Sequence, residues 1–547
     1  SYETYAIEQV VDYALDLKNF HSESHNKTII PILISTMAPE INTQILFADD
    51  GISNCIKANA TTLKQVLTDL NTNYRKESFD VNNWLNSSYK PTPTIVEAAQ
   101  ALYANHSVED ISRHGAEAIN LTLTKNAVEK IIKDSKNNKQ KSICFITGIP
   151  GAGKTLAGLD IATQSMNYEK DEHACFLSGN GPLVKVLREA LIRNKSELEN
   201  ISKKKTEPQV YAFIQNIHHF RDEYFEDTSA PIEKVVIFDE AQRAWNREQA
   251  SKFMNKKSKA KDFNYSEPEF LISVMDRHQD WCVIICLIGE GQEINTGEAG
   301  LDEWFKTLKE KYPDWNVYCS KNANPPENLN VFTQSDLHLS VSLRSFKSAL
   351  LSDFVQNVMD CKPNEARIVS QDLCEHYPIL ITRNLARAKN WVRSKARGSE
   401  RMGLLAHSNA IRLKPEGIFV KSEIDCTNWF LNKKTDVRSS CALEDCATEF
   451  DVQGLELDWT IVAWDANLRF DKGWKYLKFS GNRWQNINND VDKKYLLNSY
   501  RVLLTRARQG MVIFIPEGDK NDETRLPEFY DNLFKYLGEC GLQVLPD

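Results

Sequence analysis

One eight-residue segment constrains the fold more than any other feature of the chain. Residues 148–155 read Gly-Ile-Pro-Gly-Ala-Gly-Lys-Thr and match the pattern GxxxxGK[ST] in full. The segment follows an apolar run, SICFITG, and precedes a helical pattern, LAGLDIATQSM. A glycine-rich turn between a strand and a helix lets backbone N–H groups surround phosphates at the positive end of the helix. The sequence therefore predicts a phosphate-binding loop in an α/β fold.

The residue types of this loop fit the handling of a nucleoside triphosphate. Gly148, Gly151 and Gly153 let the backbone approach phosphates where a side chain would clash. Lys154 is expected to reach the β- and γ-phosphates of ATP, and Thr155 is expected to ligate magnesium. A glycine-rich turn with a chance lysine is the alternative, but it leaves the strand and the helix on either side unexplained.

A second segment, VVIFDEAQRAW (235–245), places two carboxylates at the end of an apolar strand. Adjacent buried acids are costly without a cation, which argues against a purely structural role. We expect Asp239 to hold magnesium, directly or through water, and Glu240 to act as the general base that polarises the attacking water.

Apolar runs alternate with helical patterns over most of the chain, which predicts parallel sheets with helices on both faces. A first set of strands is expected at 142–148, 173–179, 235–240 and 282–289, and a second at 337–345, 377–383, 402–408, 459–465 and 510–516. A linker rich in proline and asparagine lies near 322–330. We therefore expect one lobe at 96–328 and a second at 329–547, preceded by a smaller α/β unit at 1–95.

Composition excludes some classes of function. The 67 basic and 75 acidic residues give a net charge of −8, which argues against a globally basic nucleic-acid coat but not against a local basic track. The lysines at 203–205 and between 252 and 261 suit such a track or a solvated loop. The 12 cysteines lack zinc-ligand spacing and suit buried thiols in a reducing compartment. No apolar stretch is long enough to span a membrane, so we expect a cytoplasmic protein without membrane partners.

Further segments follow the phosphate loop and the two acids in a fixed order. They are LSGNGPLVKVLREAL (177–191), GEGQEINTGEAG (289–300), SLRS (342–345), EFDVQGLELDWTIV (449–462) and YRVLLTRARQG (500–510). In this order they resemble motifs Ia, III, IV, V and VI of superfamily 1 helicases. More closely, residues 140–520 resemble a bacterial helicase-like family of unknown function that is related to the Schlafen helicase domain.

The resemblance implies two RecA-like P-loop lobes that bind ATP between them. Gln292 would sense the γ-phosphate, although its spacing departs by one residue from the common GDxxQ. Arg344 would contact phosphate from the second lobe, and Arg506 would be the arginine finger, with Arg508 the weaker candidate. Gly454 and Glu456 would belong to the nucleotide site, and Glu456 would hold the ribose. The lysine that usually precedes this glycine is Gln453 here.

Residues 1–95 differ from the rest. We expect a helix at 3–20, strands at 29–36 and 44–48, and a helix near 61–72. Gln9 and Tyr13 resemble the QxxxY helix of RecB-like nucleases of the PD-(D/E)XK fold, whose metal ligands would lie upstream of Ser1. The alternatives are a plain core helix and, for Asp49 and Asp50, a plain turn. The unit is interpreted as part of a nuclease-like domain.

Three functional hypotheses remain open. The first is an ATP-dependent motor that moves on nucleic acid, DNA rather than RNA, with an attached nuclease and a role in defence against foreign DNA that the resemblance suggests. The second is an ATP-driven switch that clamps nucleic acid or controls a nuclease or protein partner, including a second copy, without translocating. The third is a scaffold that only binds ATP, against which the intact set of Lys154, Asp239, Glu240 and Arg506 argues.

Overall fold

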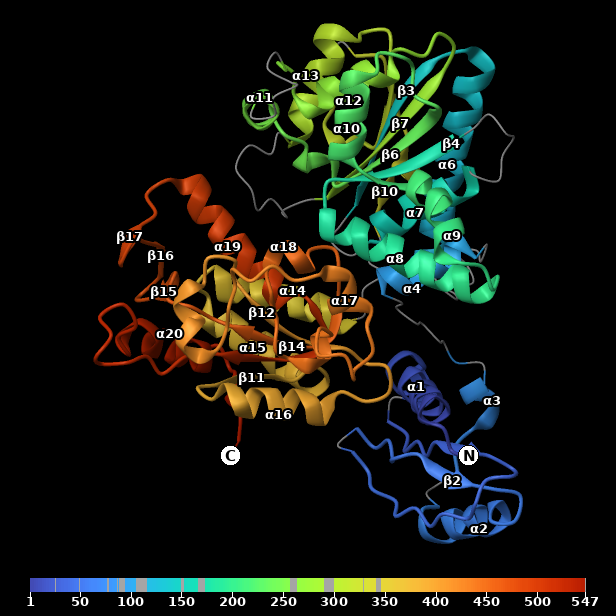
Figure 1. Cartoon of the computed structure of the whole chain (residues 1–547), viewed down its shortest axis with the longest axis vertical. Helices are drawn as coiled ribbons and strands as arrows, with labels where there is room; N and C mark the ends of the chain where they lie inside the picture. Colours follow the sequence, from blue (N-terminus) through green and yellow to red (C-terminus); the bar gives the residue numbers. More distant parts are fainter. Residues whose placement is uncertain are drawn as a thin grey trace.

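The computed structural model describes residues 1–546, apart from 25, 49, 76–77, 86, 88–93, 105–115, 149–151, 166–172, 256–262, 290–299, 328 and 341–345. Two α/β lobes and a smaller N-terminal unit make up the chain (Figure 1). Among the residues so described, no helix has the length and hydrophobicity needed to cross a membrane.

The first lobe is built on a parallel sheet in the order β5-β4-β6-β7-β3-β8-β9, with β10 also pairing with β3. Its strands are β3 (Lys141–Gly148), β4 (His173–Ser178), β5 (Ile214–Asn216), β6 (Glu233–Asp239), β7 (Cys282–Gly289), β8 (Asn316–Cys319), β9 (Val331–Thr333) and β10 (His338–Leu339). Every residue of β7 is buried, because a parallel strand with helices on both faces needs a continuous apolar run. The expected α/β fold with parallel sheets is confirmed.

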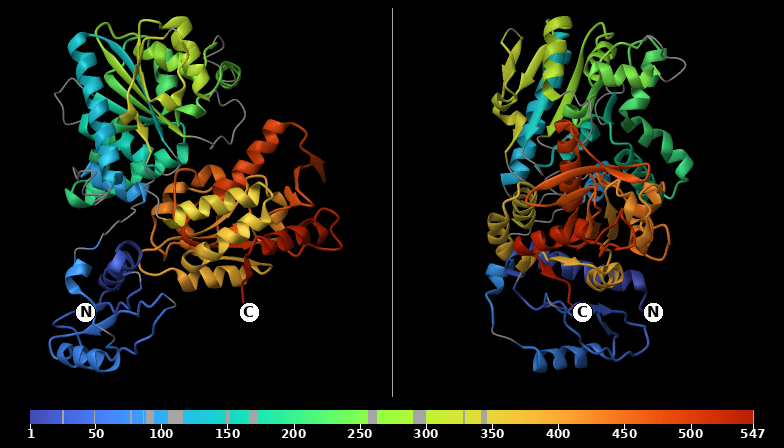
Figure 2. Two further views of the ribbon diagram at one scale, coloured as in Figure 1. Left: turned by 180° about the vertical axis from the view of Figure 1, so that it is seen from behind. Right: turned by 90° about the vertical axis from the view of Figure 1, so that its left-hand side faces the viewer.

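Helices cover both faces of this sheet (Figure 2). Alternate residues of β3 enter different cores: Cys144 and Ile146 face one, Ile143 and Phe145 the other. The first core is covered by α4 (Ile95–Tyr103), α6 (Ala116–Asn138), α7 (Lys154–Ser165), α8 (Gly181–Leu198) and α9 (Lys203–Phe213). The second is covered by α10 (Ile217–Glu226), α11 (Arg247–Met254), α12 (Glu267–Met275) and α13 (Gly300–Lys311).

The second lobe repeats this plan around a parallel sheet in the order β13-β12-β14-β18-β11-β19. Its strands are β11 (Ile379–Thr382), β12 (Met402–Ala406), β13 (Cys446–Ala447), β14 (Leu457–Ala463), β18 (Ala507–Phe514) and β19 (Gln543–Val544). Its helices are α14 (Phe346–Met359), α15 (Pro363–His376), α16 (Leu385–Lys395), α17 (Cys426–Leu431), α18 (Glu449–Val452), α19 (Asp490–Leu504) and α20 (Glu528–Glu539). Between β14 and α19 the chain forms an antiparallel sheet of β15 (Leu468–Phe470), β16 (Trp474–Ser480) and β17 (Arg483–Asn486).

The strand expected at 337–345 was assigned to the wrong sheet. His338 and Leu339 pair with Thr147 and Gly148 of β3, in the first lobe, and β9 joins the same sheet beside β8. The first sheet therefore extends beyond the boundary that we expected at residue 328. The alternation of apolar residues indicates a strand but not the sheet that it joins, and residues 341–345 lie outside the described chain.

The N-terminal unit contains α1 (Thr4–Phe20), a parallel pair of β1 (Ile32–Ile34) and β2 (Ile56–Ala58), α2 (Leu63–Asn73) and α3 (Val81–Leu85). The segment at 44–48, which we expected to be a strand, forms one isolated bridge between Phe47 and Ser53. The unit contacts the second lobe at the turn after α16. There Asp12 accepts a hydrogen bond from the Ser399 N–H at 2.9 Å, and Asp50 forms an ion pair with Arg397.

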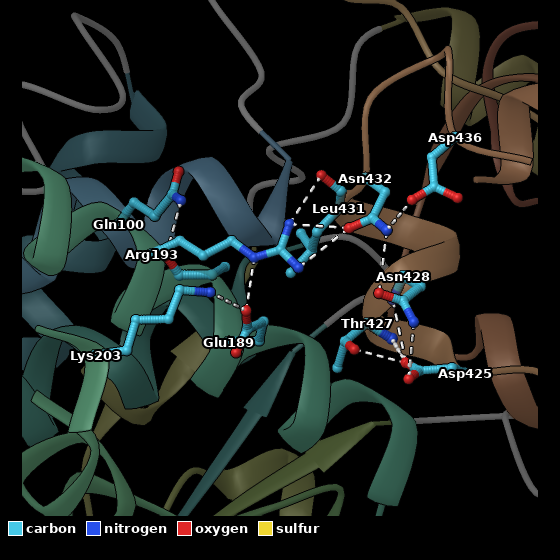
Figure 3. A network of polar contacts seen from close by, with 11 residues as sticks. Gln100, Glu189, Arg193, Lys203, Asp425, Thr427, Asn428, Leu431, Asn432 and Asp436 are labelled. Atoms are coloured by element: carbon cyan, nitrogen blue, oxygen red, sulfur yellow. Dashed lines mark hydrogen bonds and ion pairs between the residues drawn. The ribbon is translucent and has the colours of Figure 1, made fainter. Parts of the chain in front are cut away.

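Direct contacts also join the two lobes, between α8 and α17 (Figure 3). The Arg193 guanidinium donates to the Leu431 carbonyl at 3.3 Å and to Asn432 Oδ1 at 3.1 Å. Glu189 holds Arg193 from the same helix at 2.6 Å. One apolar core continues through this junction and contains residues of both lobes. The two lobes are thus packed against each other rather than connected only by a linker.

Candidate active site between the lobes

The phosphate loop leaves the first sheet where β3 ends and α7 begins. Gly153 has a φ of +79°, in the region that favours glycine, and Lys154 Nζ donates to the Gly148 carbonyl at 2.9 Å. A Cβ on Gly148 would lie 2.8 Å from Leu339 Cβ, so β10 gives a second reason for glycine that the sequence did not reveal. Gly151 lies outside the described residues.

Thr155 and Asp239 meet at the carboxyl ends of the strands. Thr155 Oγ1 donates to Asp239 Oδ1 at 3.2 Å, and the Asp239 side chain is almost fully buried. Burial raises the pKa of Asp239 to about 7 and the charge of Glu240 adds to the rise, whereas Thr155 and Lys154 lower it. A hydroxyl and a buried carboxylate beside a second acid are oxygen donors that suit a hard divalent cation, so these residues fit magnesium.

Glu240 is held in an unusual backbone conformation. Its φ of 52° lies in the left-handed region, which is uncommon for residues other than glycine and often occurs at functional sites. The Gln242 amide donates to the Glu240 carboxylate and accepts a hydrogen bond from the Gly289 N–H at 2.9 Å. Gln242 thereby fixes the proposed base against the end of β7. Sequence reasoning assigned no role to Gln242, although its position two residues after the acid was a usable signal.

A cavity of about 190 Å³ lies between the lobes at this point. Thr155, Asp239 and Glu240 line it from the first lobe, and Gln453 and Gly454 line it from the second. Asn180, Pro182, His218, Arg243, Trp245, Glu267 and Phe450 contribute further lining. The first-lobe acids and the turn predicted to be motif V therefore share one cavity.

Asn180 connects the two lobes at the edge of this cavity. Its Oδ1 caps α8 by accepting from the Leu183 N–H at 3.2 Å, and its Nδ2 donates to the Gln453 carbonyl at 2.5 Å. Gly454 has a φ of +74°, and a Cβ there would lie 3.2 Å from Leu183 Cδ2. The turn at Gln453–Gly454 is thus seated on the N-terminus of α8 and requires glycine both for its φ and for its close approach.

One wall of the cavity is aromatic. His218 packs against Trp245, with ring centroids 4.9 Å apart, and stacks on Phe253 at 5.9 Å. Beneath them Glu267 accepts from Arg221 and from the Trp245 N–H, each at 2.9 Å. Burial favours a neutral Glu267, but His218, whose Nδ1 lies 3.6 Å from the carboxylate, and the charge of Arg221 outweigh burial and lower its pKa. This wall was not predicted, because its residues are spread over three helices and a loop.

The predicted second-lobe residues lie elsewhere or outside the described chain. Arg506 is buried, and it donates to the Val502 carbonyl at 3.0 Å and to Thr505 Oγ1 at 3.2 Å. Arg508 lies 3.5 Å from Asp458, and the charges of Asp458, Glu97 and Glu456 raise the pKa of its guanidinium against the effect of burial. Among the described residues, neither arginine nor Glu456 lines the cavity.

Gln292 and Arg344 lie outside the described residues. Their predicted contacts with phosphate therefore stay predictions.

A family model described as Schlafen group 3, DNA/RNA helicase domain, matches residues 141–517, which is more than half of the chain. No curated protein matches. Among solved structures, the Pyrococcus furiosus Hef helicase domain is 10% identical, with coverage of 72% of this chain and 96% of that one and a TM-score of 0.26. The DUF1998 helicase MrfA bound to DNA is 11% identical, with coverage of 87% and 61% and a TM-score of 0.31.

The family match spans the phosphate loop, both acids, the aromatic wall and the turn at Gln453–Gly454, and its limits agree with the resemblance found over 140–520. It supports a nucleic-acid motor as the general class of function and a nucleotide-hydrolysing helicase as the general class of enzyme. The chain belongs to the Schlafen group 3 family of DNA/RNA helicase domains.

Proposed function

We propose that the protein is an ATP-dependent motor on nucleic acid, a superfamily 1 helicase or translocase that acts on DNA. The observation that carries the proposal is the shared cavity, in which the acids of the first lobe face the turn at Gln453–Gly454 of the second. Hydrolysis in such a cavity would change the contacts between the lobes. If each lobe contacts the strand, closure and opening of the lobes would move one set of contacts along the strand relative to the other.

The residues of the first lobe have distinct roles in this proposal. Lys154 and the loop glycines bind the phosphates of ATP, and Thr155 and Asp239 hold magnesium, which would neutralise phosphate charge when bound. Glu240 accepts the proton of the water that attacks the γ-phosphorus, while the bond to the bridging oxygen breaks and ADP leaves. Gln242 holds the Glu240 carboxylate in place for this transfer.

The second lobe would complete the site on closure. Arg506 is proposed as the finger, which requires its guanidinium to leave the Val502 carbonyl and turn toward the phosphates. Arg344 is proposed to contact phosphate from the second lobe, whereas Gln292 is proposed to sense the γ-phosphate from the first. Glu456 is proposed to hold the ribose, and Gly454 to form part of the nucleotide site.

The test is ATP hydrolysis by the purified chain alone and with single-stranded DNA, duplex DNA or RNA. We expect stimulation by single-stranded DNA above RNA, and directional strand displacement under the same conditions. Absence of hydrolysis with every nucleic acid would overturn the proposal.

A switch without translocation is the second candidate, and the contacts between the lobes favour it. Asn180 binds Gln453 and Arg193 binds Asn432 across the junction between the lobes. Such contacts would suit a clamp that ATP locks or releases. Hydrolysis stimulated by nucleic acid, but without directional displacement, would support this reading over a motor.

The N-terminal unit is proposed to be part of a PD-(D/E)XK nuclease-like domain. Gln9 Nε2 donates to the Tyr13 hydroxyl at 3.0 Å, and Tyr13 is 60% exposed, which opposes the alternative of a plain core helix. A parallel sheet is normally covered on both faces, yet Ile34 of β1 is half exposed. A role in defence against foreign DNA belongs to the same proposal, and phage plating on cells with and without the gene tests it.

A further inference from the structure

Gln453 carries a polar group that the described structure leaves unsatisfied. The residue is 9% exposed, and its Nε2 atom is buried without a hydrogen-bond partner. Buried amide groups are nearly always paired, because an unpaired donor loses its water without compensation. Its own carbonyl is held by Asn180, so the backbone position is fixed while the side-chain donor stays open.

The position of the residue that carries this donor suggests what the donor binds. Gln453 lines the same cavity as Thr155, Asp239 and Glu240, and it does so from the opposite lobe. Magnesium suits the oxygens of the first lobe but not an N–H donor. An oxygen of the terminal phosphate of ATP is an acceptor that the proposed reaction brings to this place.

We propose that Gln453 is a catalytic residue of the second lobe whose Nε2–H donates to a γ-phosphate oxygen of ATP. The inference rests on the proposed ATP hydrolysis. Gln453 transfers no proton; it stabilises the negative charge on the phosphoryl oxygens while water attacks and ADP leaves. A neutral donor does this without the positive charge of the lysine that the motif V pattern usually has here.

The same residue would transmit the state of the nucleotide to the junction between the lobes. Its carbonyl is bound by Asn180, which caps α8, and α8 in turn packs against α17 of the second lobe. Loss of the phosphate would release the side chain of Gln453 and leave the turn held by Asn180 alone. The contact therefore links hydrolysis to the junction between the lobes.

Gln453→Met and Gln453→Glu test the proposal, because both keep the length of the side chain. Methionine removes the donor, and glutamate adds a charge that repels phosphate. We expect each to lower kcat by about 10²-fold, as for loss of one transition-state donor. Affinity for ADP should stay within about 2-fold, and affinity for ADP–aluminium fluoride should fall about as much as kcat. Gln356→Met is the matched control, because Gln356 lies on α14 of the same lobe and its side chain donates to Asp360 on the exposed side of that lobe.

The outcomes separate the two proposals. Wild-type kcat and wild-type affinity for ADP–aluminium fluoride in Gln453→Met would overturn the role of Gln453 and leave the ATPase standing. A wild-type chain without hydrolysis would overturn the proposed function. In that case the ratio of the affinities for ATPγS and ADP tests the contact of Gln453 with the γ-phosphate. A ratio that is the same in Gln453→Met as in wild type would overturn this contact. Thermal unfolding of the nucleotide-free variants confirms that they fold.

The antiparallel sheet of the second lobe provides a second, independent observation. Residues 472–486 contain four basic residues and no acidic residue, in a chain with a net charge of −8. Lys478 pairs with Gln485 and Ser480 pairs with Arg483, so Lys478 and Arg483 lie on the same face. Both are exposed, and the described residues include no ion-pair partner for either.

The opposite face anchors this hairpin. Trp484 Nε1 donates to the Thr524 carbonyl at 2.8 Å, the Arg469 guanidinium lies 4.9 Å from the Trp484 ring, and Phe479 packs beside Trp484 at 5.1 Å. The hairpin stands at the edge of the second lobe beside α19 (Figure 1). It lies in sequence between the turn at Gln453–Gly454 and α19.

We infer that the face of β16 and β17 with Lys478 and Arg483 binds the phosphate backbone of a nucleic-acid strand. The inference rests on the proposed action on nucleic acid. Two exposed cations without ion-pair partners in the described chain suit contacts with the phosphates of a nucleic-acid strand. Such contacts weaken as the salt concentration rises and do not depend on base sequence. An acidic protein segment is the alternative occupant.

Lys478→Glu/Arg483→Glu tests this surface by titration of labelled single-stranded DNA at several salt concentrations. We expect a loss of affinity of about 10-fold or more, a salt slope smaller by about 2, and unchanged ATP hydrolysis without nucleic acid. Lys64→Glu/Lys535→Glu makes the same change in net charge on other exposed sites and is the control. Equal affinity and slope in the two double variants would overturn the hairpin inference alone and point to the acidic segment. A wild-type chain that binds no nucleic acid would overturn the proposed function as well.

Discussion

The acids of the first lobe and the arginines of the second lobe are arranged in opposite ways. Thr155, Asp239 and Glu240 converge on one cavity, where a hydrogen bond of 3.2 Å joins two of them. Arg506 donates to Val502 and Arg508 pairs with Asp458, and neither is among the described residues that line the cavity. The two halves of the predicted site are therefore in different states of assembly.

The difference follows from where each group is attached. The acids and the phosphate loop lie at the carboxyl ends of β3 and β6, which both pair with β7, so the sheet alone brings them together. The arginines follow α19, and in the proposed mechanism they would reach the phosphates only on closure of the lobes. The first lobe thus holds a preformed half of the proposed site, and the groups proposed for the second lobe would make hydrolysis depend on closure.

Lys154→Ala should have the largest effect, because it removes the cation of the preformed half. We expect hydrolysis to be abolished and ATP binding to weaken, measured by phosphate release and by equilibrium titration. Lys389→Ala on α16 is a control, since Lys389 pairs with Glu444 in the second lobe. Turnover that survives in Lys154→Ala would show that the predicted loop is not the catalytic one.

Glu240→Gln should slow hydrolysis by about 10³-fold, the range typical for loss of a general base, while ATP binding is spared. The amide keeps the size of the side chain and its contact with Gln242. Single-turnover hydrolysis and nucleotide titration separate the two effects. Wild-type turnover in Glu240→Gln would remove the assignment of Glu240 as the base.

Arg506→Ala should lower kcat by about 10²-fold with nucleotide affinity less affected, because the arginine acts only after closure. The comparison is sharpened by Arg508→Ala, which breaks the ion pair with Asp458 and should act mainly on stability. Measurements of kcat and of thermal unfolding on both variants assign the two roles. Unchanged turnover in Arg506→Ala would show that another residue acts as the arginine finger.

The sequence predicted the first half of the site because its signals are local. A strand, a glycine-rich turn and a helix are contiguous, so Lys154 and Thr155 follow from the motif, and Asp239 follows from the end of a buried strand. Gln453 was seen only as a departure from the usual lysine. Its role depends on Asn180 and on the opposite lobe, which no local pattern includes.

The fold was predicted in class but not in every connection. The strands of two or three residues, β9 and β10, carry too little pattern to say which sheet they join, and tertiary pairing with β8 and β3 decides it. The aromatic wall of His218, Trp245 and Phe253 was missed for a similar reason. Its rings come from separate elements, and their stacking depends on the position of α10 over the sheet.

The smallest effect is expected at Glu400, in the group of acids around Arg508. Burial raises the pKa of Glu400 to about 7, and the charge of Asp458 adds to the rise. Because this pKa is higher in the folded chain than the ordinary value of 4.5, the folded state binds the proton more tightly. The group therefore stabilises the fold below pH 4.5, and this contribution is lost as the pH rises to about 7.

Glu400→Gln should remove this dependence on pH, because the amide stays neutral. We expect the variant to gain about 1–2 kcal/mol relative to wild type between pH 5 and pH 8, discounted for the partial exposure of the group. Urea unfolding at several pH values measures it, and Glu444→Gln, at an exposed acid of the same lobe, is the control. A difference between Glu400→Gln and wild type that stays constant with pH would mean that Glu400 is ionised throughout. An ionised Glu400 would add to the negative charge around Arg508. Movement of Arg508 toward the nucleotide would then be less favourable than movement of Arg506.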